Sequence, residues 1–263
     1  MGRAIGPDGR MDSRRSVAWL ALQTALKARI MSLVEDQIIA LVPAFNERRA
    51  IVPVVALTAA QMPVVVVDDG STDGTGQAAA EAGAHILRHP TNHGKGAALR
   101  TGFQWALDND VRAVITLDAD GQHNPTDIPA FVQAHEQTGA HLVIGRRDHR
   151  RMPFPRTFTN PFGSWLLSLA VGEPIYDNQS GFRLYHRKLL EAIDQATVGF
   201  EFEVEVIGTA LRNDFIFAWV DIETIYGTET TSYFHPLLDS LRFLRTVWRA
   251  RRWRRPTRSG ANA

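Results

Sequence analysis

Residues 112–125, RAVITLDADGQHNP, run from an apolar segment into two acids, a glutamine and a proline. The apolar part predicts a buried β-strand. Asp118 and Asp120 at its end would share a face, as residues i and i+2 of a strand do. Two carboxylates about 6.6 Å apart in a poorly solvated cleft repel by ~2–3 kcal/mol. The pair therefore predicts a bound cation, and Asp118, Asp120 and Gln122 offer the oxygen ligands that Mg²⁺ or Mn²⁺ prefers.

A second acidic strand end supports this interpretation. Residues 63–70, PVVVVDDG, also run from an apolar segment into adjacent acids, Asp68 and Asp69. The alternative for Asp118 and Asp120 is a solvated acidic turn ahead of a helix. We favour the metal site, because two acidic strand ends in one sheet concentrate negative charge.

Strands alternate with helices on both sides of residues 112–125. Apolar runs predict the strands, and the segments between them carry helix start and stop signals. The expected strands are 38–45, 63–70, 84–90, 112–120 and 140–147, and helices are expected from about 46 and over 71–83, 94–107 and 125–139. This order predicts an α/β fold with a mixed, mainly parallel sheet that helices cover on both faces.

The second half of the chain is less regular. We expect helices over 156–170 and 199–213 and strand-like segments over 180–187 and 215–227. The first of these helices carries five large apolar residues on one face: Phe158, Phe162, Trp165, Leu166 and Leu169.

Charged residues follow three of the predicted strands. In a parallel sheet the carboxyl ends of the strands meet at one edge, where ligands bind. We therefore expect the following residues to meet in one crevice: Asp68, Asp69, Asp118, Asp120, Arg146 and Arg147.

Composition bounds the class of protein. The 263 residues are 44% hydrophobic, which is enough for the core of one large α/β domain or two small ones. The absence of cysteine excludes disulfides and thiolate metal sites. No run of eighteen apolar residues occurs, so no spanning helix is expected. We expect a single domain over 36–235, because no linker interrupts it.

Both ends of the chain are expected to form amphipathic helices. Over 1–35 we favour a helix packed on the domain surface over a membrane-lying anchor. Over 236–263, apolar and arginine stripes are typical of a basic helix in an anionic membrane interface. We rank docking on the chain's own domain second. Nucleic acid comes last, because no aromatic strand platform accompanies the arginines.

Two glycine-rich segments have alternative interpretations. Gly74, Gly76 and Ala79 match a dinucleotide fingerprint, but the acids before them would repel a pyrophosphate, so we interpret the match as accidental. Residues 92–102, NHGKGAALRTG, depart from a phosphate-binding Walker A loop, yet they bring Lys95 and backbone N–H groups to a helix start. That segment favours an anion, with a tight turn before a packed helix as the alternative.

Asp177 and Arg183 flank a Ser-Gly turn. The planar fork of Arg183 could clamp a phosphate, and the alternative is a structural pair between Arg183 and Asp177. His89, His93 and His123 form no metal-binding spacing, so we expect them to be surface or core residues.

Six segments together resemble the family 2 glycosyltransferases of the GT-A fold. They are LVPAFNE, VVVVDDGSTDGT, NHGKGAALRTGF, LDADGQHNP, IGRR and QSGFRLYHR, in this order, within residues 36–245. The resemblance is strongest to the dolichyl- or polyprenyl-phosphate hexose synthases. Glu201 and His235 stand where the mannose synthases tend to carry basic residues, so mannose and glucose both stay open.

The resemblance implies roles for individual residues. It assigns the metal to Asp118, Asp120 and Gln122. It implies that Arg146 or Arg147, together with Arg183, lies near the sugar and acceptor phosphates, and we group these arginines, Asp118, Asp120 and Asp177 as catalytic. It places the nucleotide at Pro43, Ala44, Asn46, Glu47, Asp68 and Asp69, and we add Lys95 and Ala119 to that binding group.

The implied reaction is inverting, metal-dependent transfer of a hexose from GDP-mannose or UDP-glucose to a polyprenyl or dolichyl phosphate. We expect a cytoplasmic protein held peripherally on an anionic membrane, with no nucleic-acid partner and with a homo-oligomer left open. An alternative is transfer to a soluble or glycolipid hydroxyl, for which Asp177 is the candidate base. A remote alternative is a non-catalytic nucleotide-sugar-binding adaptor.

Overall fold

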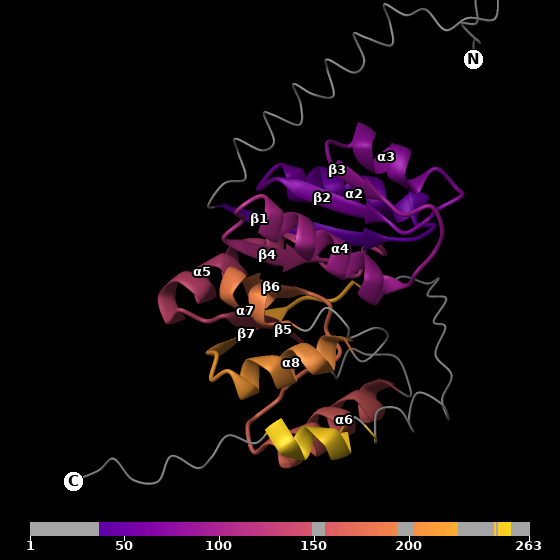
Figure 1. The fold of residues 1–263 in the computed structure, drawn as a ribbon. Coiled ribbons are helices and arrows are strands. Elements are labelled where there is room, and N and C mark those ends of the chain that lie inside the picture. Colours follow the sequence, from indigo (N-terminus) through magenta and orange to yellow (C-terminus); the bar gives the residue numbers. More distant parts are fainter. Residues whose placement is uncertain (1–36, 149–155, 194–201, 226–244, 246, 254–263) are drawn as a thin grey trace, which may run out of the picture.

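The computed structural model describes residues 37–148, 156–193, 202–225, 245 and 247–253 (Figure 1). Within them seven strands form one sheet in the order β3-β2-β1-β4-β6-β5-β7. The strands are β1 Ile38–Ala44, β2 Val64–Asp68, β3 His85–Arg88, β4 Ala113–Thr116, β5 Leu142–Arg147, β6 Arg183–His186 and β7 Phe217–Ile222. Four neighbouring pairs are parallel, and β6 runs antiparallel to both β4 and β5. The predicted α/β fold with a mixed, mainly parallel sheet is confirmed.

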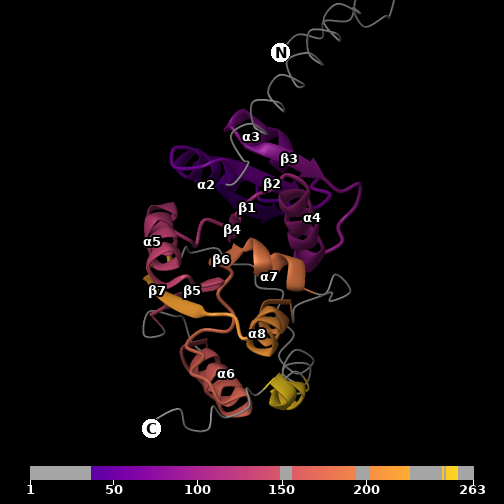
Figure 2. The same ribbon diagram turned by 60° about the vertical axis from the view of Figure 1, so that its left-hand side comes forward.

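Helices cover both faces of this sheet. They are α2 Arg48–Ala59, α3 Thr75–Glu81, α4 Lys95–Asp108, α5 Ile128–Thr138, α6 Arg156–Val171, α7 Arg187–Ala192 and α8 Phe202–Arg212, with short 3-10 turns η1 Pro125–Asp127 and η3 Arg251–Trp253. Figure 2 shows α2 and α5 on one side of the sheet and α4, α7 and α8 on the other. Gly139, with a φ of 66°, ends α5, as the sequence predicts.

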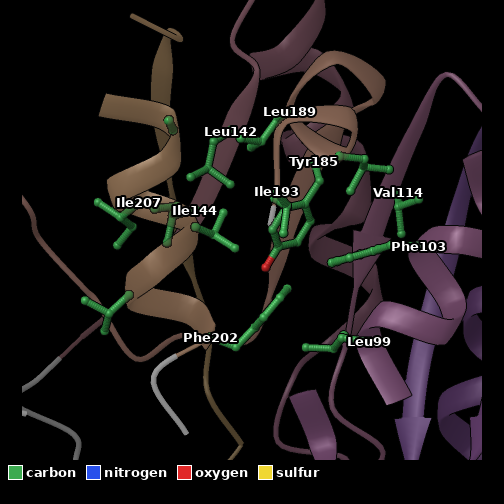
Figure 3. Close-up of a cluster of buried hydrophobic side chains, with 14 of the residues drawn as sticks. Leu99, Phe103, Val114, Leu142, Ile144, Tyr185, Leu189, Ile193, Phe202 and Ile207 are labelled. Carbon is green, nitrogen blue, oxygen red and sulfur yellow. The ribbon is translucent and has the colours of Figure 1, made fainter. Parts of the chain in front are cut away.

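Two separate cores follow from the alternation of side chains along the strands. In β1, Ile39 and Leu41 pack toward α4, α7 and α8, whereas Ile38, Ala40 and Val42 pack toward α2, α3 and α5. Figure 3 shows part of the first core, where Phe103 of α4 meets Tyr185 of β6 with ring centroids 5.0 Å apart. Because both faces are buried, the strands are apolar throughout rather than alternating.

The structure corrects the sequence prediction at the end of β4. This strand ends at Thr116, so Asp118 and Asp120 lie in the turn that follows and do not share a strand face. The reason is local: Gly121 adopts a φ of 76°, and the Asp120 carboxylate accepts the N–H of Gln122 at 2.9 Å, which fixes a tight turn. The structure also adds α7, which the sequence analysis did not predict.

Parts of three predictions lie outside the described residues. They are the N-terminal helix, most of the basic C-terminal segment, and the positions of Glu201 and His235. Within the described part of the chain, no helix combines the length and the apolar character needed to span a bilayer. The three-part division of the chain stays a prediction.

Candidate active site at the carboxyl edge of the sheet

The carboxyl ends of β1, β2, β4 and β5 lie at the same edge of the sheet, because β4 and β5 are both antiparallel to the β6 between them. For the ends of β4 and β5, electrostatics supports the predicted convergence. Burial raises the pKa of the Asp118 carboxyl group, Lys95 is the main group that lowers it, and the Arg147 guanidinium adds a smaller lowering. Asp118 and Arg147 therefore belong to one site.

The loops after β1 and β2 are joined by hydrogen bonds. Asn46, at a φ of 56°, donates its backbone N–H to Ser71 Oγ at 3.0 Å and accepts the Thr72 N–H at 3.0 Å. The Glu47 N–H donates to Thr75 Oγ1 at 2.9 Å. A hollow of about 310 Å³ lies beside these loops, and its lining residues are Asn46, Glu47, Arg48, Arg49 and Asp73. Two of the predicted nucleotide-binding residues, Asn46 and Glu47, thus line an open depression.

Asp68 and Asp69 are buried, with 1% and 2% of their surface exposed. Asp68 accepts the Ser71 N–H at 2.9 Å, and Asp69 accepts His89 Nδ1 at 2.6 Å and the Gly94 N–H at 2.7 Å. Their carboxylates are therefore used to fix the loops after β2 and β3. Direct hydrogen bonds from a nucleotide to Asp68 and Asp69 stay a prediction, since an ionised carboxylate can accept more bonds than these.

Lys95, the first residue of α4, bridges two carboxylates. Its Nζ lies 2.6 Å from Asp118 Oδ1 and 3.1 Å from Glu203 Oε1. Burial raises the pKa of Asp118, but Lys95 and His123 lower it to about 2. Burial alone would lower the pKa of Lys95, and the two carboxylates raise it well above its usual range. Asp118 is therefore an anion fixed by a permanent cation.

The second acid of the turn faces a different environment. Burial raises the pKa of Asp120, and the nearby Asp118 carboxylate raises it further. Burial also raises the pKa of Glu47, with Asp120 and then Asp73 adding to the effect. Negative charge is therefore concentrated between the ends of β1 and β4, and of Asp118, Asp120 and Glu47 it is Asp118 that has a short ion pair with another described residue.

This donor set fits a hard divalent cation. Among the described residues no three His, Cys, Asp or Glu side chains form a complete metal-binding group. Two carboxylates with an amide are the ligand set of ions such as Mg²⁺ that share their coordination with substrate phosphates. The mutual repulsion of Asp118, Asp120 and Glu47 is what a cation would relieve. The chemistry of these residues therefore fits the predicted ion, and the hydrogen bond from the Gln122 N–H to Asp120 fixes the backbone of the turn that carries them.

His123 is a core residue, as the sequence analysis expected. It is 4% exposed, its ring lies 5.2 Å from that of Phe182, and its Nδ1 accepts the Asp118 N–H at 3.1 Å. Burial lowers the pKa of His123. A neutral His123 thus positions the backbone at Asp118.

The two arginines at the end of β5 form different ion pairs. Arg147 binds Asp177 through two bonds of 2.7 and 2.9 Å, and Asp177 is 1% exposed. Arg146 binds Asp221 of β7 in the same way, at 2.6 and 2.9 Å, on the protein surface. Of the two, Arg147 is the arginine whose charge lowers the pKa of Asp118, by less than Lys95 does.

Arg183 is fully buried. Its guanidinium donates to the carbonyl oxygens of Ser180 at 2.7 Å, Glu203 at 2.6 Å and Asn178 at 3.0 Å. This geometry differs from both predictions: Asp177 pairs with Arg147 rather than Arg183, and the Arg183 guanidinium is enclosed by carbonyls rather than open to a phosphate. Arg183 instead connects the 178–180 turn to α8.

Three predicted binding residues are backbone elements of the site. Ala44 is 3% exposed and Ala119 is 4% exposed, and both contribute to the core beneath the turns. Pro43 lies within β1, directly before Ala44. The side chains of Ala44 and Ala119 are therefore structural, whereas Pro43 is half-buried.

Two residues of the site were missed by the sequence analysis. Glu203 holds Lys95 from α8, and a Cβ added at Gly181 would lie 2.7 Å from Asp118 Oδ2 and 2.8 Å from Lys95 Nζ. Glu203 carried no signal, because its partner lies on another helix far away in sequence. Gly181 was visible only as part of a Ser-Gly turn.

Comparisons with known proteins agree with this geometry. Residues 39–194 match the family described as Glycosyl transferase family 2. The chain is 32% identical to polyprenol monophosphomannose synthase of Mycolicibacterium smegmatis over 66% of this chain and 72% of that one. It is 30% identical to undecaprenyl-phosphate mannosyltransferase of Micrococcus luteus over 65% of this chain and 76% of that one.

A solved structure shares the fold. Glucosyl-3-phosphoglycerate synthase of Mycobacterium tuberculosis, crystallised with Mn²⁺, uridine diphosphate and glucosyl-3-phosphoglycerate, superposes with a TM-score of 0.63. It is 21% identical, and the match covers 89% of this chain and 84% of that one. Because the matched residues run from β1 to α7 and make up more than half of the chain, this chain belongs to glycosyl transferase family 2 and is a hexosyltransferase of the GT-A fold.

Proposed function

We propose that this enzyme transfers a hexose from a nucleotide-diphosphate sugar to a polyprenyl phosphate. The donor is GDP-mannose or UDP-glucose, and the names of the two relatives reported above favour mannose and a polyprenyl acceptor. The observation that carries the proposal is the Asp118 carboxylate, fixed by Lys95 at 2.6 Å, with Asp120 close enough that the two carboxylates repel.

This arrangement suits a reaction between two phosphate groups. An acceptor phosphate oxygen attacks the anomeric carbon as the bond from that carbon to the diphosphate breaks, with inversion. The products are a glycosyl phosphodiester and a nucleoside diphosphate. A phosphate monoester has its second pKa near ~6, so at neutral pH the acceptor is mostly a dianion and needs no general base. Lys95 and Arg147 are each paired with carboxylates of the chain, so a divalent cation would supply the charge that offsets the phosphate groups.

Asp118, Asp120 and Gln122 are the residues that would hold a divalent cation, whose charge would offset that of the departing diphosphate. Lys95 keeps Asp118 ionised and oriented, so the carboxylate is ready to accept a ligand without a proton being released. The relative crystallised with Mn²⁺ supports this expectation for the fold.

Transfer to a hydroxyl acceptor is the second candidate, and it would require a base. Asp177 was the candidate, but its carboxylate is buried, paired with both arms of Arg147, and also accepts the Gln179 and Ser180 N–H groups at 3.0 and 3.1 Å. Its oxygens thus already accept hydrogen bonds within the chain, which leaves it poorly placed to take a proton from a substrate hydroxyl. The geometry therefore favours the phosphate acceptor.

A lipid-linked acceptor places the enzyme at a membrane surface. We propose peripheral attachment at the cytoplasmic face, where nucleotide sugars and anionic lipids meet.

The test is transfer of radiolabelled sugar from a panel of nucleotide sugars to a polyprenyl phosphate in detergent, with Mg²⁺ or Mn²⁺ and with chelator. We expect label in the organic phase with one donor, lost with chelator and reduced at least a hundredfold in Asp118→Asn. Asp108→Asn, an exposed acid at the end of α4, is the matched control and should retain activity. Transfer that persists with chelator, or that goes only to hydroxyl acceptors, would contradict the proposal.

A further inference from the structure

Helix α6 is apolar on both of its faces. Leu167, Ala170 and Val171 are buried in the core shared with α7 and α8. On the opposite side, Phe162 is 60% exposed and Trp165 is 55% exposed, with ring centroids 5.8 Å apart. A surface helix normally carries charged or polar residues opposite its core face, and one that is apolar all round lies in a core or a membrane.

The outer face of α6 has no charged residue beyond the start of the helix. Leu169, 56% exposed, follows Phe162 and Trp165 on this face, and the sequence from 157 to 172 contains no Asp, Glu, Lys or Arg. We call Phe162, Trp165 and Leu169 the apolar face. Isolated exposed hydrophobic residues are ordinary, but an aromatic group of this kind marks an interaction surface.

Basic residues lie next to α6. η3 packs against α6, and Val247, Ala250 and Trp253 are buried in the same core as the inner side of α6. Figures 1 and 2 both place this C-terminal piece beside α6, at the end of the molecule opposite α3. Within residues 247–253 the exposed residues are Trp248, Arg249, Arg251 and Arg252. The Arg252 guanidinium lies over the Trp248 ring, 5.8 Å from its centroid.

We propose that the apolar face and the adjacent arginines form one surface that docks on an anionic lipid bilayer. Aromatic residues with polar tips prefer the bilayer interface, and arginines near it pair with anionic headgroups. The positive charge of these arginines favours an anionic bilayer over a second copy of this chain as the partner. Two copies docked through this surface would bring the same arginines together, and like charges repel. The inference rests on the proposed function for the acceptor but assigns a surface that the active site does not contain.

The position of α6 suits delivery of a lipid-linked acceptor. The helix ends at Val171, and the chain then reaches Tyr176, which packs under Arg146, and Asp177, which binds Arg147. The carboxyl end of α6 therefore leads directly to the residues that pair with the arginines at the end of β5.

The test is flotation of the full chain with vesicles of equal parts phosphatidylcholine and phosphatidylglycerol, compared with pure phosphatidylcholine. We expect the double variant Phe162→Ser/Trp165→Ser to lose at least about tenfold in partition coefficient. Arg249→Gln/Arg252→Gln should weaken binding to the mixed vesicles by about fivefold for each arginine, with little effect on the neutral ones. Leu57→Ser is the matched control, because Leu57 is 52% exposed on α2, and it should bind as the unmodified protein does.

Unchanged vesicle binding by the folded double variant overturns the inference. A lipid-free dimer that this variant dissociates, or a fall in Tm with no change in vesicle binding, also overturns it, because the face is then covered by another copy or by the chain itself. If the double variant does not fold, Trp165→Phe decides: it should keep vesicle affinity, and quenching by brominated lipid should fall relative to the unmodified protein. Equal quenching in the two proteins overturns the inference.

Failure of the proposed sugar-transfer function can be distinguished from failure of the docking inference by a different assay. It would appear as absence of sugar transfer to polyprenyl phosphate in detergent, where no bilayer is needed. We expect Phe162→Ser/Trp165→Ser to keep transfer in detergent and to lose it on vesicles.

Discussion

Lys95 Nζ lies 2.6 Å from Asp118 Oδ1, so an amine at the first residue of α4 fixes the first acid after β4. The same amine reaches Glu203 of α8 at 3.1 Å, and an added Cβ at Gly181 would contact both Lys95 and Asp118. The acid on which the proposed chemistry depends is thus held by elements from three separate parts of the chain.

Lys95→Met should remove the cation that keeps Asp118 ionised and oriented. Because its side chain is partly exposed, we expect a modest loss of stability, about 1–2 kcal/mol, and a larger loss in kcat/KM, on the order of a hundredfold. Steady-state transfer assays and urea unfolding measure the two effects. Arg100→Met, on the same helix, is the control, and equal kcat/KM in Lys95→Met and the unmodified enzyme would show that Lys95 does not position Asp118.

Gly181→Ala should push Asp118 and Lys95 apart, because the new methyl group would lie under 3 Å from both. We expect about 1–3 kcal/mol of destabilisation and a disproportionate loss of transfer. Gly139→Ala, at a φ of 66° with no atom near the added Cβ, is the matched control for backbone strain. The control should lose stability and keep its activity per folded molecule.

Asp177→Asn should lower the free energy of unfolding by more than Asp221→Asn does, although each variant breaks a two-bond ion pair with an arginine. Asp177 is buried, and its loss leaves a poorly solvated Arg147, so we expect a cost of about 3 kcal/mol. Asp221 is 74% exposed, so its loss should cost about 0.5 kcal/mol. Denaturant unfolding compares them.

The pH–rate profile of Asp177→Asn addresses the acceptor. If the acceptor is a phosphate, Asp177 does not act as a base. The fall in rate at acidic pH, where there is one, should then be the same in the unmodified enzyme and in Asp177→Asn. An acidic limb lost in Asp177→Asn would favour a hydroxyl acceptor instead.

Arg183→Lys should act on folding rather than on substrate binding. Lysine cannot reproduce the three bonds to Ser180, Glu203 and Asn178, so we expect about 2–4 kcal/mol of destabilisation. The KM for the acceptor should stay within a factor of two or so of the unmodified value. A stable variant with a KM raised tenfold or more would instead indicate that Arg183 contacts the acceptor phosphate.

His186 should make stability depend on pH. Burial, followed by the neighbouring His135 and His141, lowers the pKa of His186 from 6.5 to about 4. Between these values the unfolded chain binds a proton that the folded chain does not, so the free energy of unfolding falls as the pH decreases through this window. We expect this residue to account for on the order of 1–2 kcal/mol, after allowance for solvent screening.

His186→Asn isolates this effect, because asparagine can still accept the Lys188 N–H that His186 caps at the start of α7. The difference in stability between neutral pH and about pH 4, measured by urea unfolding, should be smaller in this variant. The same change at exposed His93 is the control, and an equal reduction there would rule out the assignment to His186.

The sheet was predictable because its signals are local. The apolar runs at 63–70 and 140–147, each ended by charged residues, indicate buried strands. The carboxyl ends of these two strands lie at the same edge of the sheet. Pro125 and Gly139 mark the limits of a helical region in the sequence as in the structure. Asp118 and Asp120 were wrongly predicted to lie within a strand over 112–120. The strand ends at Thr116, and a hydrogen bond from the Gln122 N–H to Asp120 stabilises a turn after it.

The sequence by itself determined the alternation of strands and helices, the acidic edge of the sheet and the family, because periodicity, turn residues and motif order are properties of neighbouring residues. Only the tertiary structure decided which charges meet: Asp177 with Arg147 rather than Arg183, Glu203 with Lys95, and an apolar side of α6 turned away from the core. Those pairings depend on helices crossing the sheet from distant parts of the chain. Several residues of the same charge are available as partners for each ion pair. Which of them forms the pair depends on burial and distance, and neither follows from the order of residues in the sequence.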